Sequence, residues 1–179
     1  MFNNFASFIP YLVLLSHILL LVLFFALLSR NSWGKSIAGF LGRQALWFGF
    51  LVAVVAVLGS LFYSEVIGFE PCVLCWWQRI FLYPMLIIFS MALWKKNDSA
   101  FLYVLPLAVL GGLIAAYQSY ILLGGVSLLP CTALEGDCSK IYVMAFGYIT
   151  IPMMSLTISL YTLLLAWADR IYRNENSNA

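Results

Sequence analysis

Charged residues are scarce in this sequence of 179 residues. They make up 9% of the chain, against 64% hydrophobic residues, whereas an average soluble domain carries roughly 25% charged residues. The formal net charge is only +2 and no basic patch is present, so nothing indicates a nucleic-acid partner. The sequence also lacks internal repeats, a nucleotide-binding motif and a haem signature. These absences favour an integral membrane protein whose main surroundings are a lipid bilayer.

Five apolar runs are each long enough to cross a membrane. An α-helix rises about 1.5 Å per residue, and the hydrocarbon core is about 30 Å thick. Because backbone exposed to lipid must satisfy its own hydrogen bonds, each run is predicted to be a helix. We therefore expect an all-α integral membrane protein with spans at about residues 8–28, 45–67, 76–93, 101–123 and 142–168.

The first run is predicted to be a retained span rather than a cleaved signal peptide. A signal peptide carries a basic segment ahead of an apolar region of about 7 to 15 residues. Residues 1–7 contain no Lys or Arg, and the apolar run that follows is longer. Between the first two spans, residues 30–44 are expected to form a loop.

The basic residues predict the orientation of the chain, because cytoplasmic loops are enriched in Lys and Arg. With five alternating spans, one side receives Arg30, Lys35, Arg43, Lys95, Lys96, Arg170 and Arg173. The opposite loops carry Lys140 with Glu70, Glu135 and Asp137. The first side is therefore expected to be the cytoplasm, and the N-terminus and all four cysteines are expected outside, where disulfides persist.

The four cysteines form two close pairs. Cys72 and Cys75 have CxxC spacing where a loop meets an apolar run, and Arg79 follows four residues later. At a helix start, unpaired amides and the helix dipole favour a thiolate, and a cation one turn away does the same. Cys131 and Cys138 lie in a polar loop, where a visiting protein could reach them.

Three interpretations of these pairs remain open from the residues alone. Each pair could form a local structural disulfide, but neither pair joins distant segments, so the stabilisation of the fold would be small. The four sulfurs could bind zinc, although the six residues between Cys131 and Cys138 exceed the usual spacing. The favoured interpretation is redox exchange, in which electrons from an external dithiol enter at the loop pair and pass to Cys72 and Cys75. A lipid-soluble quinone is the acceptor that could reach the second pair at the membrane edge.

The sequence around both pairs resembles the DsbB/BdbC family of quinone-dependent thiol oxidases, and is closer to the BdbC-like branch. The resemblance is carried by residues 71–75 (PCVLC), 78–84 (QRIFLYP), 136–138 (GDC) and 146–152 (FGYITIP). It implies a four-helix bundle over residues 45–168, with residues 1–44 as an additional N-terminal helix and cytoplasmic loop, and 169–179 as a cytoplasmic tail. It also implies a bacterial cytoplasmic (inner) membrane protein that reoxidises a DsbA-like thioredoxin-fold partner.

The resemblance also implies a role for each candidate site residue. Cys131 is expected to form the mixed disulfide with the partner, with Cys138 as its loop mate. Cys72 is expected to exchange with the loop pair, and Cys75 to face the quinone, either ubiquinone or menaquinone. Arg79 is expected to hold a quinone oxygen. No metal is expected.

Three features depart from the family pattern. The spacing between Cys131 and Cys138 is short beside the better-known Gram-negative pattern and closer to the BdbC-like branch. The first helix has no counterpart in a four-span family, and its His17 is expected to serve packing or interhelical hydrogen bonding. Gln78 stands where some relatives carry an acid, so a proton-transfer role is not expected there.

A vitamin K epoxide reductase-like enzyme is an alternative, but in that family the CxxC pair follows the loop pair, whereas here it precedes it.

Overall fold

The computed structural model describes residues 2–29, 31–97, 99–125 and 140–177. Within these ranges the chain is helical, and its only β-type pairing is an isolated bridge between Ala145 and Ile149. Five of the helices are long and apolar enough to span a membrane, including one near the N-terminus. The predicted all-α class with five spans is therefore confirmed. The elements are α1 (Phe2–Leu28), α2 (Ser32–Arg43), α3 (Ala45–Leu61), the π-helical turn η1 (Phe62–Val66), α4 (Val73–Lys95), α5 (Ala100–Leu122) and α6 (Ile151–Ser177).

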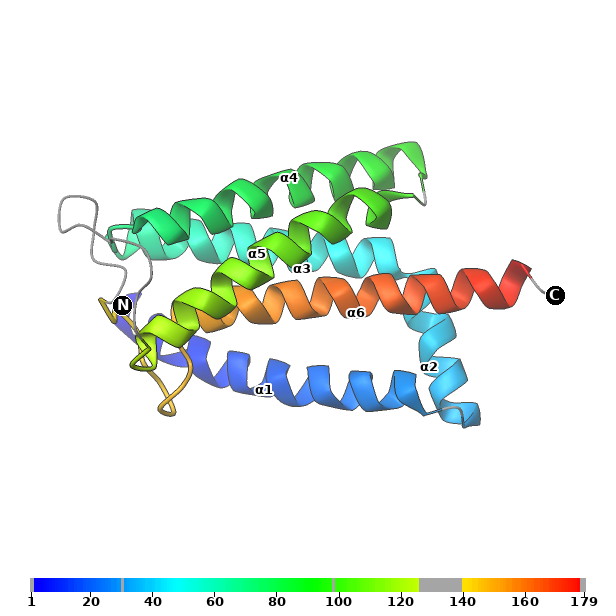
Figure 1. Cartoon of the computed structure of the whole chain (residues 1–179), viewed down its shortest axis with the longest axis horizontal. Helices are drawn as coiled ribbons and strands as arrows, with labels where there is room; N and C mark the ends of the chain where they lie inside the picture. The colour runs from blue at the N-terminus through cyan, green and yellow to red at the C-terminus, as the bar shows by residue number, and fades with distance from the viewer. Residues whose placement is uncertain (1, 30, 98, 126–139, 178–179) are drawn as a thin grey trace.

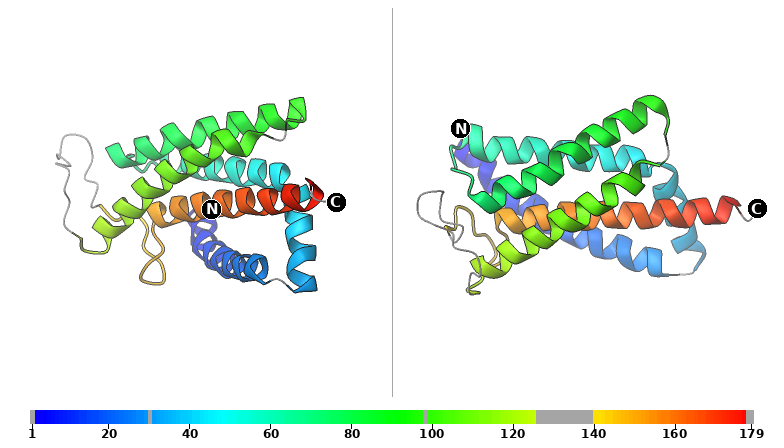
Figure 2. Two further views of the ribbon diagram at one scale, coloured as in Figure 1. Left: turned by 45° about the vertical axis from the view of Figure 1, so that its right-hand side comes forward. Right: turned by 45° about the horizontal axis from the view of Figure 1, so that its top comes forward.

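The helices α3, α4, α5 and α6 form a bundle, and α1 runs beside it (Figure 1). Within the bundle α5 packs on α4 and α6, and α3 packs on the same two helices. The helix α1 contacts α6 and α2, on the side of the molecule away from α4 (Figures 1 and 2). The short helix α2 crosses the end of the bundle and links α1 to α3 (Figure 2).

A stripe of small residues lets α5 approach its neighbours closely. Val104, Ala108 and Ala115 are fully buried, and Gly111 and Gly112 lie between them. A Cβ atom on Gly112 would lie 3.1 Å from the Cβ of Ser159 on α6. Small residues of this kind are typical of helix interfaces in membranes, because close backbone approach increases van der Waals contact.

The structure corrects the predicted start of the last span. Residues 142–150 are not helical, and α6 begins at Ile151 and continues to Ser177, through most of the predicted tail. A tight turn at residues 145–149 precedes it, with positive φ at Phe146 and Gly147. Left-handed backbone cannot continue an α-helix, so the apolar run 142–150 ends as a turn.

The structure also corrects the expected loop at residues 30–44. Most of it is the helix α2, which buries Ala38 and Leu41 and leaves Trp33 84% exposed. This segment is amphipathic, with its apolar face against α6 and α1. A mixed composition with three glycines favours a loop, but the spacing of the buried residues is helical.

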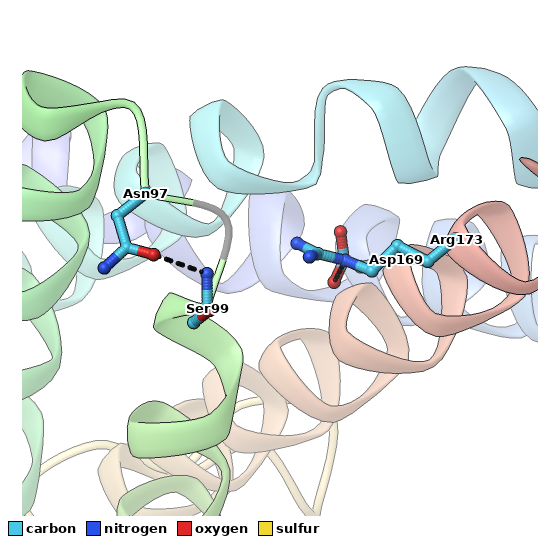
Figure 3. Close-up of polar contacts among 4 residues, drawn as sticks. All are labelled: Asn97, Ser99, Asp169 and Arg173. Atoms are coloured by element: carbon cyan, nitrogen blue, oxygen red, sulfur yellow. Dashed lines mark hydrogen bonds and ion pairs between the residues drawn. The ribbon is translucent and has the colours of Figure 1, made fainter. Parts of the chain in front are cut away.

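The two ends of the bundle differ in what they carry. The CxxC pair begins α4 at the end that also holds the N-terminus of α1 and the start of α6 (Figure 1). At the opposite end, the α4–α5 turn lies near the C-terminal part of α6 (Figure 3). There the side-chain oxygen of Asn97 accepts a hydrogen bond from the Ser99 amide, and Arg173 pairs with Asp169 at 2.7 Å.

A dithiol at the start of a helix

Cys72 and Cys75 lie at the first turn of α4. Cys72 is the N-cap residue, with extended backbone (φ −72°, ψ 170°), and Cys75 is the third helical residue. The helix thus begins three residues earlier than predicted, and the amide of Trp76 closes its first turn on the Cys72 carbonyl at 3.1 Å. Cys72 is buried, Cys75 is half-buried, and their sulfurs lie 3.2 Å apart. Both thiols therefore sit where helix amides favour negative charge, as predicted.

A buried glutamine from α5 contacts both sulfurs. The Nε2 atom of Gln118 donates to Cys72 Sγ at 3.2 Å and to Cys75 Sγ at 3.6 Å. Its Oε1 atom accepts a hydrogen bond from Gln78 Nε2 at 2.7 Å. Because Gln78 occupies the oxygen, the amide of Gln118 must present its two N–H groups to the sulfurs. This amide pair provides donors that stabilise a thiolate on either cysteine.

Arg79 is directed to α3 rather than to the sulfurs. Its Nε donates to Ser60 Oγ at 2.9 Å and its Nη2 donates to the Ser60 carbonyl at 3.0 Å. Its guanidinium carbon also lies 5.2 Å from the centre of the Trp76 ring. Within the part of the chain that the structure describes, no hydrogen bond joins Arg79 to either sulfur. Arg79 is buried and thus places a fixed positive charge on α4, one turn after Cys75.

A pocket opens beside the two sulfurs. Its walls include Cys72, Cys75 and Gln118 on one side, and Lys140, Tyr142 and Thr150 from the segment before α6 on the other. Tyr142 holds that segment in place, because its hydroxyl donates to the Glu70 carbonyl at 3.1 Å. Its ring also stacks on Phe69 at 4.6 Å. The dithiol therefore faces a pocket with one cation, Lys140, at its rim.

The structure brings together some of the predicted site residues. Cys72, Cys75 and Arg79 share the start of α4. Cys131 and Cys138 lie outside the described residues. Sequence reasoning did not identify Gln118 as a contact of the cysteines. The available signal was a polar residue inside an apolar span, where side chains of this type are costly unless they have a partner.

Taken together, the fold and the site define a multi-pass membrane protein with a dithiol at one end of its helical bundle, facing a pocket. The comparisons with known proteins then identify the family. Residues 42–168 match the family described as disulfide bond formation protein DsbB, and the chain belongs to this family. Residues 1–41, which include α1, lie outside the matched region.

Several bacterial disulfide formation proteins are similar to this chain. It is 43% identical over 106 residues to the SPbeta prophage-derived disulfide bond formation protein B of Bacillus subtilis, covering 59% of this chain and 72% of that protein. It is 39% identical over 113 residues to disulfide bond formation protein C of the same organism, covering 62% and 81%. A probable disulfide formation protein of Coxiella burnetii is 35% identical over 122 residues, covering 67% and 83%. No solved structure matches the chain significantly. Membership of this family implies a membrane thiol oxidase.

Proposed function

We propose that this chain is a membrane thiol:quinone oxidoreductase that reoxidises a DsbA-like thioredoxin-fold protein. It acts in a bacterial cytoplasmic membrane, with both cysteine pairs on the extracytoplasmic side, and so supports disulfide formation there. Residues 45–168 provide the working bundle. The observation that carries the proposal is a dithiol at a helix start, contacted by a buried amide donor and facing a pocket, in a chain of the DsbB family.

The electrons and protons balance over two exchange steps. A thiolate of the reduced partner attacks the Cys131–Cys138 disulfide, and resolution of the mixed disulfide leaves the partner oxidised and the loop pair reduced. A loop thiolate then attacks the Cys72–Cys75 disulfide, which restores the loop disulfide and leaves Cys72 and Cys75 reduced. Each step moves two electrons and two protons. A bound quinone supplies the chemistry that returns Cys72 and Cys75 to a disulfide, because it takes up two electrons and two protons on becoming a quinol.

The described residues fit a quinone. Its ring is apolar, and half-exposed apolar side chains lie on the first turns of α4, at Trp76, Trp77 and Ile80. Its oxygens require hydrogen-bond donors and gain negative charge on reduction. Gln118 and Lys140 line the dithiol pocket and can donate there, and Arg79 carries a positive charge one turn after Cys75. We assign Cys75 to the acceptor side, Cys72 to exchange with the loop pair, and Arg79 to the stabilisation of oxygen charge.

The test of this function combines the purified protein with a reduced thioredoxin-fold thiol oxidase and a soluble quinone analogue. We expect quinone absorbance to fall in step with partner thiols, one quinone for each disulfide formed. Cys75→Ser and Cys131→Ser should each abolish turnover. The matched control is Ser119→Ala, because the Ser119 hydroxyl is buried on α5 beside Gln118 and, among the described residues, bonds only to its own helix, at the Ala115 carbonyl. Turnover that survives the loss of Cys72, Cys75 or Cys131, or thiol loss without quinone loss, contradicts the proposal.

A further inference from the structure

The N-terminal helix α1 meets the rest of the protein at a few specific points. Between residues 8 and 28 few side chains of α1 are buried, so this part of the helix has little packing to hold it. His17 forms a hydrogen bond with Thr157 on α6 at 2.7 Å and contacts the hydroxyl of Tyr148 at 3.4 Å. One turn further along α6, the Tyr161 hydroxyl donates to the Ser16 carbonyl. These polar contacts lie near the middle of α1.

The hydrogen bonds around His17 define which of its ring nitrogens carries the proton. The Thr157 hydroxyl donates to the Met153 carbonyl at 2.8 Å, so its oxygen is free to act as the acceptor for His17 Nε2. In a neutral imidazole that carries its proton on Nε2, the Nδ1 atom is an acceptor. The Tyr148 hydroxyl therefore donates to Nδ1, and the ring of His17 bridges α6 and Tyr148.

Tyr148 belongs to the tight turn at residues 145–149, which leads directly into the wall of the dithiol pocket. The turn is closed by paired hydrogen bonds between Ala145 and Ile149, at 3.0 and 2.9 Å. The next residue, Thr150, lines the pocket and caps α6, because its hydroxyl accepts from the Met153 amide at 3.4 Å. A second contact from α1 reaches the same turn, where Tyr11 packs edge-on against Phe146 at 5.3 Å.

We propose that His17 is a positioning residue through which α1 holds the 145–149 turn against α6 and so fixes the Thr150 wall of the dithiol pocket. This inference rests on the proposed function, because it takes the pocket to be the place where the dithiol is oxidised. It also assigns a task to a helix that lies outside the region matched by the DsbB family. Without the His17 bridge, the turn keeps its contact with Tyr11 but loses one hydrogen bond, so it moves away from α6 more often and the pocket opens more often.

The test measures the accessibility of the dithiol directly. In a chain that carries Cys131→Ser and Cys138→Ser, only Cys72 and Cys75 react with the small uncharged reagent 4,4′-dithiodipyridine, whose product is followed by absorbance. Loss of one hydrogen bond shifts a local opening equilibrium by about fivefold. We therefore expect His17→Ala to accelerate modification by about that factor, and Tyr148→Phe, which removes a single oxygen, to do the same. The double variant should be no faster than the faster single variant, because both substitutions break the same contact between His17 and Tyr148.

Conservative variants separate the contact of His17 with Tyr148 from its contact with Thr157. His17→Asn places an acceptor oxygen near the position of Nδ1 and should restore most of the protection, whereas His17→Gln keeps a donor for Thr157 and should not. The matched control is Ser16→Ala, because the Ser16 hydroxyl, within the described part of the chain, bonds only inside α1, at the Val13 carbonyl. Its rate should equal that of the parent chain. Three results would overturn the proposal. The modification rate could be unchanged in both His17→Ala and Tyr148→Phe, or the two accelerations could multiply in the double variant. Ser16→Ala could also accelerate modification as much as His17→Ala does.

This readout is independent of quinone and partner. If turnover with a quinone fails in the parent chain while His17→Ala still accelerates modification, the proposed function is wrong and the positioning role stands. If turnover follows the proposed function while His17→Ala and Tyr148→Phe leave modification unchanged, only the positioning role is lost.

Discussion

At the scale of single residues, the chemistry of the site depends on the orientation of one amide. Gln118 is 3% exposed and Gln78 is 8% exposed, so neither side chain can turn to water for its hydrogen bonds. The bond from Gln78 fixes the Gln118 oxygen and leaves the nitrogen for the sulfurs. A buried donor of this kind stabilises the thiolate more than the thiol, because hydrogen bonds to charged acceptors are the stronger ones. Gln118 thus touches the reacting atoms, whereas Gln78 acts through it.

Gln118→Leu should slow thiol oxidation. Loss of hydrogen bonds to a charged acceptor costs about 1.5–3 kcal/mol, which corresponds to a rate lower by roughly 10- to 150-fold. Gln78→Leu should give a smaller loss, because Gln118 keeps its nitrogen but loses its fixed orientation. The measurement is the turnover rate with reduced partner, together with the rate at which reduced Cys72 and Cys75 are alkylated at constant pH. Ser119→Ala serves as the control on the same helix turn. Equal rates in Gln118→Leu and the parent chain would show that the amide does not contribute.

At the scale of helices, α3 and α4 approach each other at a glycine. A Cβ atom on Gly49 would lie 2.7 Å from the ring of Phe89. Phe89 is fully buried and packs edge-on against Phe101 of α5 at 5.5 Å, so its ring has no free space to move into. The contact between α3 and α4 therefore requires a residue without a side chain at position 49.

Gly49→Ala should destabilise the bundle by about 1–3 kcal/mol, the usual effect of an overpacked core. The same helix provides a matched control, because a Cβ atom on Gly59 would meet nothing within 4 Å. Gly59→Ala should therefore leave stability unchanged or raise it by up to about 1 kcal/mol, since alanine is the better helix former. Thermal unfolding in detergent, followed by loss of helical circular dichroism, measures both. The interpretation fails if both variants unfold at the same temperature.

The sequence predicted the helices well where hydropathy decides and poorly where backbone conformation decides. The five spans follow from apolar runs, since lipid leaves no alternative to helix. The run at residues 142–150 is equally apolar, but Phe146 and Gly147 adopt positive φ, which hydropathy does not reveal. Likewise, the CxxC motif was visible as a local pattern. The contact of Gln118 with it was not, because Gln118 lies 46 residues after Cys72 and 43 after Cys75 and meets them through the packing of α5 on α4.

At the scale of the whole molecule, exposed tryptophans mark both ends of the bundle. Trp33 and Trp94 are 84% and 88% exposed and lie on α2 and at the end of α4, opposite the dithiol. Trp76 and Trp77 are half-exposed beside Cys75. Tryptophan concentrates at membrane–water interfaces, so the two groups indicate the levels of the two interfaces. This position supports the proposed access of both a lipid-soluble quinone and a water-soluble partner to the dithiol.

The orientation of the molecule can be tested with cysteines placed at the two ends. Glu70 and Asn97 are both exposed and lie at the dithiol end and at the α4–α5 turn, respectively. In a chain whose four native cysteines are replaced by serine, Glu70→Cys should react with a membrane-impermeant maleimide in right-side-out vesicles. Asn97→Cys should react only in inside-out vesicles. The physical reason is the cluster of Lys and Arg at the Asn97 end, which is retained in the cytoplasm during insertion. The reverse pattern would place the dithiol in the cytoplasm, where thiols are kept reduced, and an extracytoplasmic partner could not reach it.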